Sequence, residues 1–515
     1  MRHDFDPGRR RALRTSAALL ALSASGCALQ PRSSVRAPAY PFTLGVASGD
    51  PVADGFVLWT RLAPVPLDGG GMPPLPVEVD WEVAEDEAFR SIRMAGRALA
   101  EPAWGHSVHV EVEGLAADRW YWYRFRWGGA QSPVGRARTA PVLGAALTRL
   151  RFGYASCQHY EQGYFSAYRH LVADAPDLIL HLGDYIYETS WGEPVRRHEA
   201  GEPYTLAEYR NRYARYKLDR DLQAAHAACP WLLCWDDHEV DNDYAGAHSQ
   251  DHDPAERFLA RRAAAYQAYW EHMPLRRYAR PKGADMLLYQ RSGFGDLVGF
   301  HVLDTRQYRD DQACATADKG GGQVVTACAE LADPARSMLG PQQERWLLQG
   351  LAYSKARWNI LAQGLLMAPL DQTPGTEVGA WTDGWDGYPA ARERILRRLA
   401  EARTPNPVVI GGDIHSYWAT ELSPEPGAAP VATELVGTSI SSAGVPYESF
   451  AALLPENPHV KFFDSRARGY VLCELSPQRL EAAFRAVDDV RDPASGAHTL
   501  ARFAVEAGRA AIQTA

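Results

Sequence analysis

Short apolar runs recur along the chain from residue 150 onward, and each one stops abruptly at polar side chains. They lie at 178–182, 231–235, 299–303, 358–362 and 408–410, and a further run lies at 150–155. Apolar runs of this length, bounded by glycine and polar residues, are typical of strands buried on both faces. Because ligands gather beyond the carboxyl ends of strands in an open α/β sheet, we expect the residues that follow these runs to meet at one edge.

Helical segments alternate with these strands. Thr205 and Glu208 form a capping box that begins a helix running toward residue 225. A second helix begins near Pro254 and ends just before Pro274, and a third begins near residue 340. The tail at 499–513 is predicted to be a short amphipathic helix that caps the sheet. Residues 146–515 are therefore expected to form one α/β domain.

The segment before this domain shows the period of two that is typical of strands. Polar and apolar residues alternate at 106–112 and at 120–125, and glycine and proline separate the short strands. We expect residues 41–145 to form an N-terminal β-sandwich. Gly114-Leu115 followed by 120–125 resembles a strand pair of a fibronectin type III module.

Residues 1–40 are predicted to be a signal peptide and linker. Arginines at 9–11 precede a short apolar stretch at 17–24, which is too short to span a bilayer. Paired arginines favour export by the twin-arginine route, and a general secretory signal with incidental arginines is the alternative. Ser25-Gly26-Cys27 makes Cys27 a candidate lipidation site, although Ala24 stands where leucine is usual, so ordinary cleavage remains open.

The composition is that of a globular protein with several domains, and it does not by itself indicate a function. A length of 515 residues predicts two or three domains, and 46% hydrophobic residues suffice for a large core. A net charge of −9 argues against a dedicated nucleic-acid-binding surface, which needs a concentrated basic face. No other segment is apolar enough to cross a membrane. Cys314 and Cys328 flank a glycine-rich loop, and a disulfide there would stabilise the fold by about 3 kcal/mol.

The residues that follow the predicted strands are types that bind metal ions. Thiolate, phenolate and imidazole groups suit a polarising transition metal, whereas carboxylate and amide oxygens suit a hard ion such as calcium. The mixture predicts a site for two different metals. The candidate ligands are Cys157, Asp184, Tyr187, Asp237, Asp413 and His415, with Gln363 as a further candidate.

Five motifs stand at these strand ends: Ala-Ser-Cys-Gln at 155–158, His-Leu-Gly-Asp-Tyr-Ile-Tyr-Glu at 181–188, Trp-Asp-Asp-His-Glu-Val-Asp-Asn at 235–242, Leu-Asp-Thr-Arg at 303–306 and Gly-Asp-Ile-His at 412–415. They resemble the motifs of calcineurin-like metallophosphoesterases, particularly purple acid phosphatases. The resemblance to the PhoD-like alkaline phosphatase family is closer and covers nearly all of the chain after the signal. It implies a layered αββα sandwich behind the N-terminal sandwich.

The resemblance also implies a ferric ion and calcium. Asp184 is expected to bridge the two metals. Sequence logic does not separate Asp236 from Asp237, but alignment on Asp-His-Glu favours Asp237. The implied iron ligands are Cys157, Asp184, Tyr187 and His415, and the implied calcium ligands are Asp184, Asp237 and Asp413, with Gln363 weaker.

Two further residues receive catalytic roles from the same motifs. Arg306 is expected to offer planar donors to the phosphoryl group, and His238 to orient the phosphate or protonate the departing alkoxide. The implied function is that of an exported, periplasmic or secreted, alkaline phosphatase that uses metal-activated hydroxide. The alternatives are a phosphodiesterase or phospholipase D-like hydrolase of the same family, and a non-catalytic exported binding module.

Overall fold

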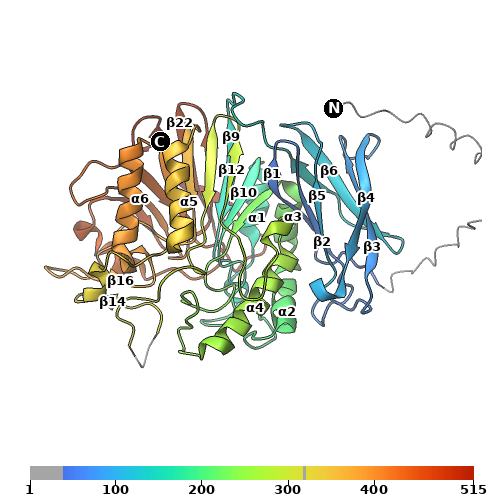
Figure 1. Cartoon of the computed structure of the whole chain (residues 1–515), viewed down its shortest axis with the longest axis horizontal. Helices are drawn as coiled ribbons and strands as arrows, with labels where there is room; N and C mark the ends of the chain where they lie inside the picture. Colours follow the sequence, from blue (N-terminus) through green and yellow to red (C-terminus); the bar gives the residue numbers. More distant parts are fainter. Residues whose placement is uncertain (1–38, 317–319) are drawn as a thin grey trace, which may run out of the picture.

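Two β-sheets packed face to face form the centre of this computed structural model, which describes residues 39–316 and 320–515 (Figure 1). The predicted signal peptide and Cys27 lie outside the described residues. The first sheet has ten strands. In spatial order they are β24 (Ile512–Thr514), β23 (Ala497–Glu506), β22 (Arg479–Val487), β21 (Arg468–Leu475), β9 (Leu150–Ala155), β10 (Leu178–Leu182), β11 (Trp231–Cys234), β1 (Val46–Val52), β2 (Gly55–Arg61) and β5 (Ser107–Val112).

The second sheet has seven strands and faces the first. Its parallel centre is formed by β13, β15 and β17, as β9, β10 and β11 form that of the first sheet. In spatial order the strands are β12 (Gln290–Phe294), β13 (Val298–Val302), β15 (Trp358–Ala362), β17 (Pro407–Gly411), β19 (Ala432–Val436), β18 (Tyr417–Leu422) and β20 (Val460–Asp464). The predicted buried strands are thus confirmed, but they are divided between two sheets.

Helices cover the outer face of each sheet and complete the αββα layers (Figure 1). The capping box that begins α2 is confirmed, with the Thr205 N–H donating to Glu208 Oε2 at 2.8 Å. The helices are α1 (Ser166–Ala173), α2 (Leu206–Lys217), α3 (Arg220–Ala228) and α4 (Ala255–His272) on the ten-stranded sheet, α5 (Gly340–Tyr353) and α6 (Pro389–Ala402) on the seven-stranded sheet, and the short α7 (Tyr447–Ala451).

The period of two along each strand explains the layers. Leu178, Leu180 and Leu182 of β10 point into the core between the sheets, whereas Ile179 packs against the helices. Both faces of the strand are therefore apolar, as the continuous hydrophobic run requires. The fold places the ends of β9, β10, β11, β13, β15 and β17 at a common edge because each set is parallel.

The predicted C-terminal capping helix is wrong. Residues 497–506 form strand β23, which pairs antiparallel with β22, and residues 512–514 pair with β23 as β24. Phe503 and Val505 enter the core between the sheets. A free edge of β22 satisfies the backbone hydrogen bonds of the tail better than a helix lying on the surface would.

The N-terminal sandwich shares a sheet with the following domain. Strands β1, β2 and β5 extend the ten-stranded sheet, because β1 pairs parallel with β11 through Gly49 and Trp231. A side chain at Gly49 would lie 2.4 Å from the carbonyl of Pro274, so only glycine permits this approach. The opposite layer of the sandwich comprises β4 (Ile92–Ala100), β3 (Val77–Ala84), β6 (Trp120–Trp127), β7 (Ala130–Gln131) and β8 (Gly135–Arg138).

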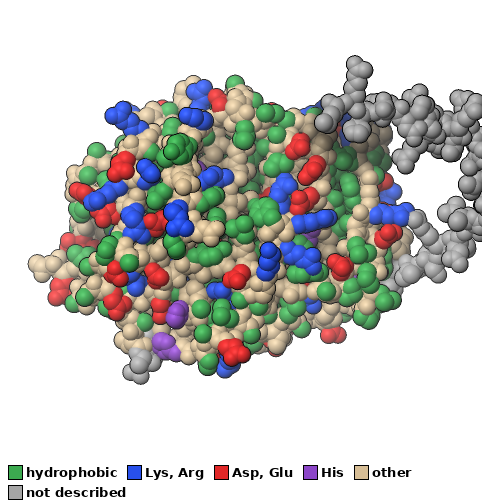
Figure 2. Space-filling view, in the orientation of Figure 1, with side chains coloured by type: hydrophobic (Ala, Val, Ile, Leu, Met, Phe, Trp, Pro, Cys, Tyr) green, Lys and Arg blue, Asp and Glu red, His purple; other side chains and the backbone are tan. Residues whose placement is uncertain are grey.

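A disulfide joins Cys314 to Cys328, the two cysteines that flank the glycine-rich loop. It closes a loop near the two-stranded sheet of β14 (Val324–Val325) and β16 (Ala380–Trp381). Basic and acidic side chains are interspersed on the face seen in Figure 2. Within 39–316 and 320–515, none of the helices combines the length and hydrophobicity that a bilayer crossing requires.

Candidate metal centre

The turns after the parallel strands hold four predicted ligands in an uncommon backbone conformation. Cys157, Asp184, Asp413 and His415 have φ values of 56°, 56°, 64° and 52°. Residues other than glycine rarely occupy this left-handed region, and where they do the strain is concentrated at functional sites. Gly183 reaches φ 105°, and a side chain there would lie 2.5 Å from Asp236. The local backbone thus turns each ligand toward the edge shared by the two sheets.

The first group of ligands, here the thiol cluster, comprises Cys157, Asp184, Tyr187 and His415. A ligand atom of Cys157, of Asp184 and of His415 lie within 4.8 Å of one another. The Tyr187 hydroxyl lies 2.8 Å from Asp184 Oδ2 and 3.0 Å from His415 Nε2. Since His415 Nδ1 lies 2.8 Å from the carbonyl of Ala443 and donates to it, Nε2 carries the free lone pair.

The second group, here the carboxylate cluster, comprises Asp236, Asp237 and Asp413, whose ligand oxygens also lie within 4.8 Å of one another. Asp184 and Asp237 form a third such set with His238. Asp184 therefore belongs both to the thiol cluster and to the set that contains Asp237. This is the position that a carboxylate bridging two metals requires.

Several buried oxygens of these clusters have no hydrogen-bond partner among the described residues. They include Asp184 Oδ1, Asp236 Oδ2 and Asp237 Oδ1. Burial, and then the neighbouring Asp184, raise the pKa of Cys157 and of Tyr187 well above their usual values. A thiol and a phenol with such raised pKa values ionise only when a cation is close. Together with the unpaired buried carboxylates, they form a ligand set that fits bound cations.

Arg306 lies among the carboxylates of the site. Its side chain is fully buried, and it donates to Asp236 and, at 2.8 and 3.0 Å, to both oxygens of Asp383. Its remaining nitrogen lies 3.6 Å from Asp237 and 3.8 Å from Asp413. This nitrogen has no hydrogen-bond partner among the described residues, so the expectation that Arg306 offers donors to a phosphoryl group stays a prediction.

The amide of Gln363, the further candidate ligand, makes its hydrogen bonds with protein groups. Its amide oxygen accepts hydrogen bonds from the Leu365 N–H at 2.9 Å and from Trp385 Nε1 at 3.2 Å, and its amide nitrogen donates to the Leu365 carbonyl. Both lone pairs of the amide oxygen are occupied by donors. Gln363 stabilises the turn after β15, and its amide oxygen has no lone pair left to coordinate an ion.

His238 lies beside both clusters and is held by Glu188. Its Nδ1 donates to Glu188 Oε2 at 2.7 Å, which leaves Nε2 free to act. Burial alone lowers the pKa of His238, but the carboxylates of Glu188 and Asp237 outweigh it and raise the pKa well above its usual value. The ring packs between Tyr187, at a centroid distance of 4.1 Å, and Trp191, at 5.5 Å.

Sequence reasoning did not assign three residues that position the site. Glu239 accepts the backbone N–H groups of Asp184, Tyr185 and Asp236, so one carboxylate fixes the ends of β10 and β11. Glu239 lies inside a recognised motif, which was the available signal. Asp383, which pairs with Arg306, belongs to no such motif and gave no signal.

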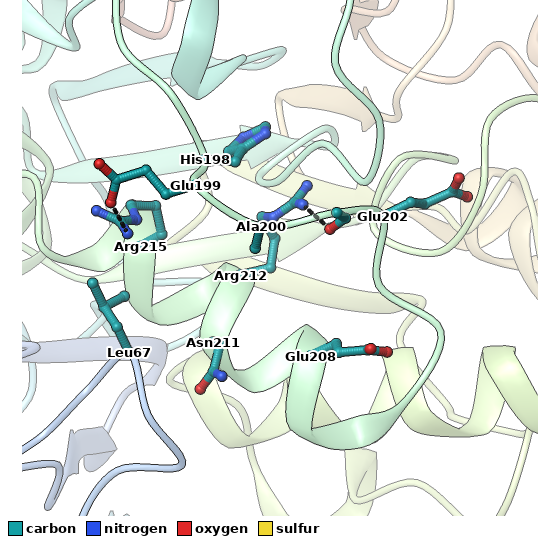
Figure 3. A pocket seen from close by; sticks show the side chains of 10 residues that line it. Leu67, His198, Glu199, Ala200, Glu202, Glu208, Asn211, Arg212 and Arg215 are labelled. Atoms are coloured by element: carbon teal, nitrogen blue, oxygen red, sulfur yellow. Dashed lines mark hydrogen bonds and ion pairs between the residues drawn. The ribbon is translucent and has the colours of Figure 1, made fainter.

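Arg212 on α2 is the third positioning residue. It donates to the carbonyls of Tyr187, of Glu188 at 2.9 Å and of Gly201 at 2.7 Å. Figure 3 shows it projecting from α2 into a polar cavity beside the loop that follows Glu188. Since the sequence contains many arginines, this one could not be recognised before its carbonyl partners were known.

Comparison with known proteins identifies consistent relatives. Residues 152–484 match the family model described as PhoD-like phosphatase, and residues 26–141 match that of the PhoD-like phosphatase N-terminal domain. Alkaline phosphatase D of Bacillus subtilis (strain 168) is 46% identical over 476 residues, which cover 90% of this chain and 80% of that protein.

Solved structures agree with these matches. The structure of PhoD superposes with a TM-score of 0.89 at 45% identity and covers 93% of each chain. A purple acid phosphatase from yellow lupin (Lupinus luteus) seeds has a TM-score of 0.58 at 11% identity, covering 91% of this chain and 75% of its own. The second likeness concerns the fold alone, and it is the fold expected from the strand-end motifs.

Proposed function

We propose, because this chain belongs to the PhoD-like phosphatase family, that it cleaves phosphate esters at a centre holding iron and calcium. The chain is a phosphatase, a hydrolase of phosphate esters. The observation that carries the metal proposal is the double membership of Asp184, which lies in the thiol cluster and also beside Asp237.

The two clusters differ in the ions that they suit. Cys157, Tyr187 and His415, with Asp184, would hold ferric iron, because thiolate, phenolate and imidazole prefer a polarising transition metal. Asp184, Asp237 and Asp413 would hold calcium through oxygen. When bound, such a ferric ion lowers the pKa of a coordinated water so that hydroxide is available at ordinary pH.

The protein residues around the ions would orient the ester and move one proton. His238, held through Nδ1 by Glu188, presents Nε2 as the donor to the departing alkoxide. Arg306 keeps Asp236 in place by a buried ion pair and extends toward Asp237. Positioning and charge suffice for phosphoryl transfer, so no covalent enzyme intermediate is required.

Colour tests the metal assignment. Iron bound by Tyr187 and Cys157 should give strong visible absorption that bleaches on reduction, whereas zinc, a filled-shell ion, gives none. Elemental analysis of the purified protein should find iron and calcium together. Tyr187→Phe should change the hue while Cys157 remains bound. A colourless, zinc-loaded and fully active enzyme would contradict the iron assignment and leave the phosphatase activity standing.

Substrate range and location need separate tests. Release of the alcohol from monoesters and from diesters, measured on the same metal-loaded preparation, separates a monoesterase from a diesterase or phospholipase D-like enzyme, because cleavage of a diester frees an alcohol and leaves a phosphate monoester. The arginines at 9–11 support export by the twin-arginine route. Replacement of Arg10 and Arg11 by lysine should hold the precursor in the cytoplasm, and unchanged export would favour the general secretory route.

A further inference from the structure

One aromatic side chain at the metal centre is exposed and has no role in the chemistry above. Trp191 lies in the loop between Tyr187 and α2, with 39% of its surface exposed. Among the tryptophans of the described ranges it is the one whose side chain is exposed rather than buried or half-buried. Its place beside His238, rather than its exposure alone, makes it a candidate to contact the substrate.

The ring of Trp191 packs against His238, Tyr187 and His159. It lies nearly parallel to the ring of His238, at 25° and a centroid distance of 5.5 Å. It also meets the edges of Tyr187 at 5.2 Å and His159 at 4.4 Å. Trp191 therefore lies beside His238, the residue proposed to protonate the leaving group.

Hydrogen bonds fix the backbone of Trp191 relative to the ligands. Gln162 donates from Nε2 to the Trp191 carbonyl at 3.1 Å and accepts from the Ala443 N–H at 2.7 Å. The Ala443 carbonyl in turn accepts from His415 Nδ1 at 2.8 Å. A short chain of hydrogen bonds thus connects the backbone of Trp191 to His415, a candidate iron ligand.

We propose that Trp191 is a specificity-determining residue that stacks on the alcohol portion of the ester and selects phosphate esters with a planar aromatic group next to the scissile bond. The proposal rests on the phosphatase function and deepens it. A planar group can lie on the indole face by offset stacking, which a saturated ring of equal size matches poorly. The planarity of the group that lies on Trp191 would thus discriminate between leaving groups, while the metal ligands stay the same.

Two substrates isolate this effect from leaving-group reactivity. Benzyl phosphate and cyclohexylmethyl phosphate both release a primary alcohol and differ in the planarity of one ring. The wild-type enzyme should have a kcat/KM for benzyl phosphate about fivefold higher than for cyclohexylmethyl phosphate, the effect expected for one aromatic pair. No preference in the wild-type enzyme overturns the proposal without requiring any variant.

Substitution then assigns the preference to the residue. Trp191→Leu should abolish the preference while Trp191→Phe keeps most of it, and both should retain the metals. Tyr204→Leu is the matched control, because Tyr204 is a 41% exposed aromatic in the same loop that packs on Arg261 instead. The control should keep the wild-type ratio.

The outcomes separate this proposal from the function on which it rests. If Trp191→Leu slows both esters equally, the ring merely shields His238 and the specificity proposal is wrong. If the ratio is unchanged, the proposal is also wrong. If the metal-loaded wild-type enzyme releases phosphate from no ester, the phosphatase assignment itself fails.

Discussion

The thiol cluster and the carboxylate cluster lie at the same edge of the two sheets, yet the protein neutralises them differently. Cys157 and Tyr187 have raised pKa values, first because they are buried and then because Asp184 is near, so they remain neutral without a cation. The carboxylate cluster instead has a permanent counter-charge, since the Arg306 guanidinium is enclosed by Asp236 and Asp383. Burial raises the pKa of Asp236 and of Asp413 as well, but there the Arg306 guanidinium opposes the rise. The thiol cluster thus depends on its metal for ionisation, whereas the carboxylate cluster has a protein cation beside it.

This difference has a consequence for folding without metals. A protonated thiol and phenol can remain buried at low cost, because both are uncharged and hydrogen-bonded, Cys157 to Ser156 at 3.1 Å and Tyr187 to Asp184 at 2.8 Å. Ionised carboxylates cannot do so without a counter-charge. We infer that Arg306 preserves the carboxylate cluster in the metal-free protein.

Loss of the shared carboxylate should break both clusters at once and give the largest effect. Asp184→Asn removes the charge that both sets of ligands use. We expect iron and calcium to be lost together and activity to fall by more than about 1000-fold, as befits a loss of several kcal/mol of metal-supplied stabilisation. Elemental analysis and phosphate release measure this.

Asp174→Asn, a change outside both clusters, is the control for that variant and should keep its metals. A full metal complement in Asp184→Asn would show that this residue does not bridge.

Removal of the guanidinium should affect the carboxylate cluster and spare the thiol cluster. Arg306→Met leaves Asp236 and Asp383 buried without a counter-charge, which should lower the free energy of unfolding by about 3–5 kcal/mol. Denaturant unfolding of the metal-free protein measures the change. Arg306→Lys should recover only part of it, because an ammonium group cannot serve both carboxylates in one plane.

The visible band assigned to the thiol cluster serves as the internal reference for Arg306→Met and should persist. A variant with wild-type stability and a reduced rate would instead return Arg306 to a substrate-binding role.

The smallest effect should come from a change at Glu188, which is hydrogen-bonded to His238 beside both clusters. Glu188 raises the pKa of His238, so Glu188→Gln should lower that pKa. The imidazolium then loses its proton at a lower pH, and the alkaline limb of kcat should move to lower pH by about 1 unit or more. A kcat–pH profile measures the shift.

Glu193→Gln, in the exposed part of the same loop, should leave the kcat–pH profile unchanged. An unshifted alkaline limb in Glu188→Gln would remove His238 from the proton-transfer step.

The candidate site was more predictable than its surroundings. Cys157, Asp184, Asp237 and His415 could be selected from sequence because each follows a buried apolar run, and a strand end is a local property. The helix capping box at Thr205 was likewise local. By contrast, the tail at 497–506 was expected to be a helix. Its strand conformation depends on pairing with the edge of β22, which is distant from local sequence signals.

The sequence by itself determined which residue types stand at the strand ends and in which order, because hydrophobic periodicity and turn residues act over a few positions. Only the tertiary structure decided which charges meet. Arg306 pairs with Asp236 across 70 positions and with Asp383 across 77, and the Gln363 amide is taken up by Leu365 and Trp385. Such partners depend on how two sheets pack, since a buried donor binds the acceptors that the completed core places around it.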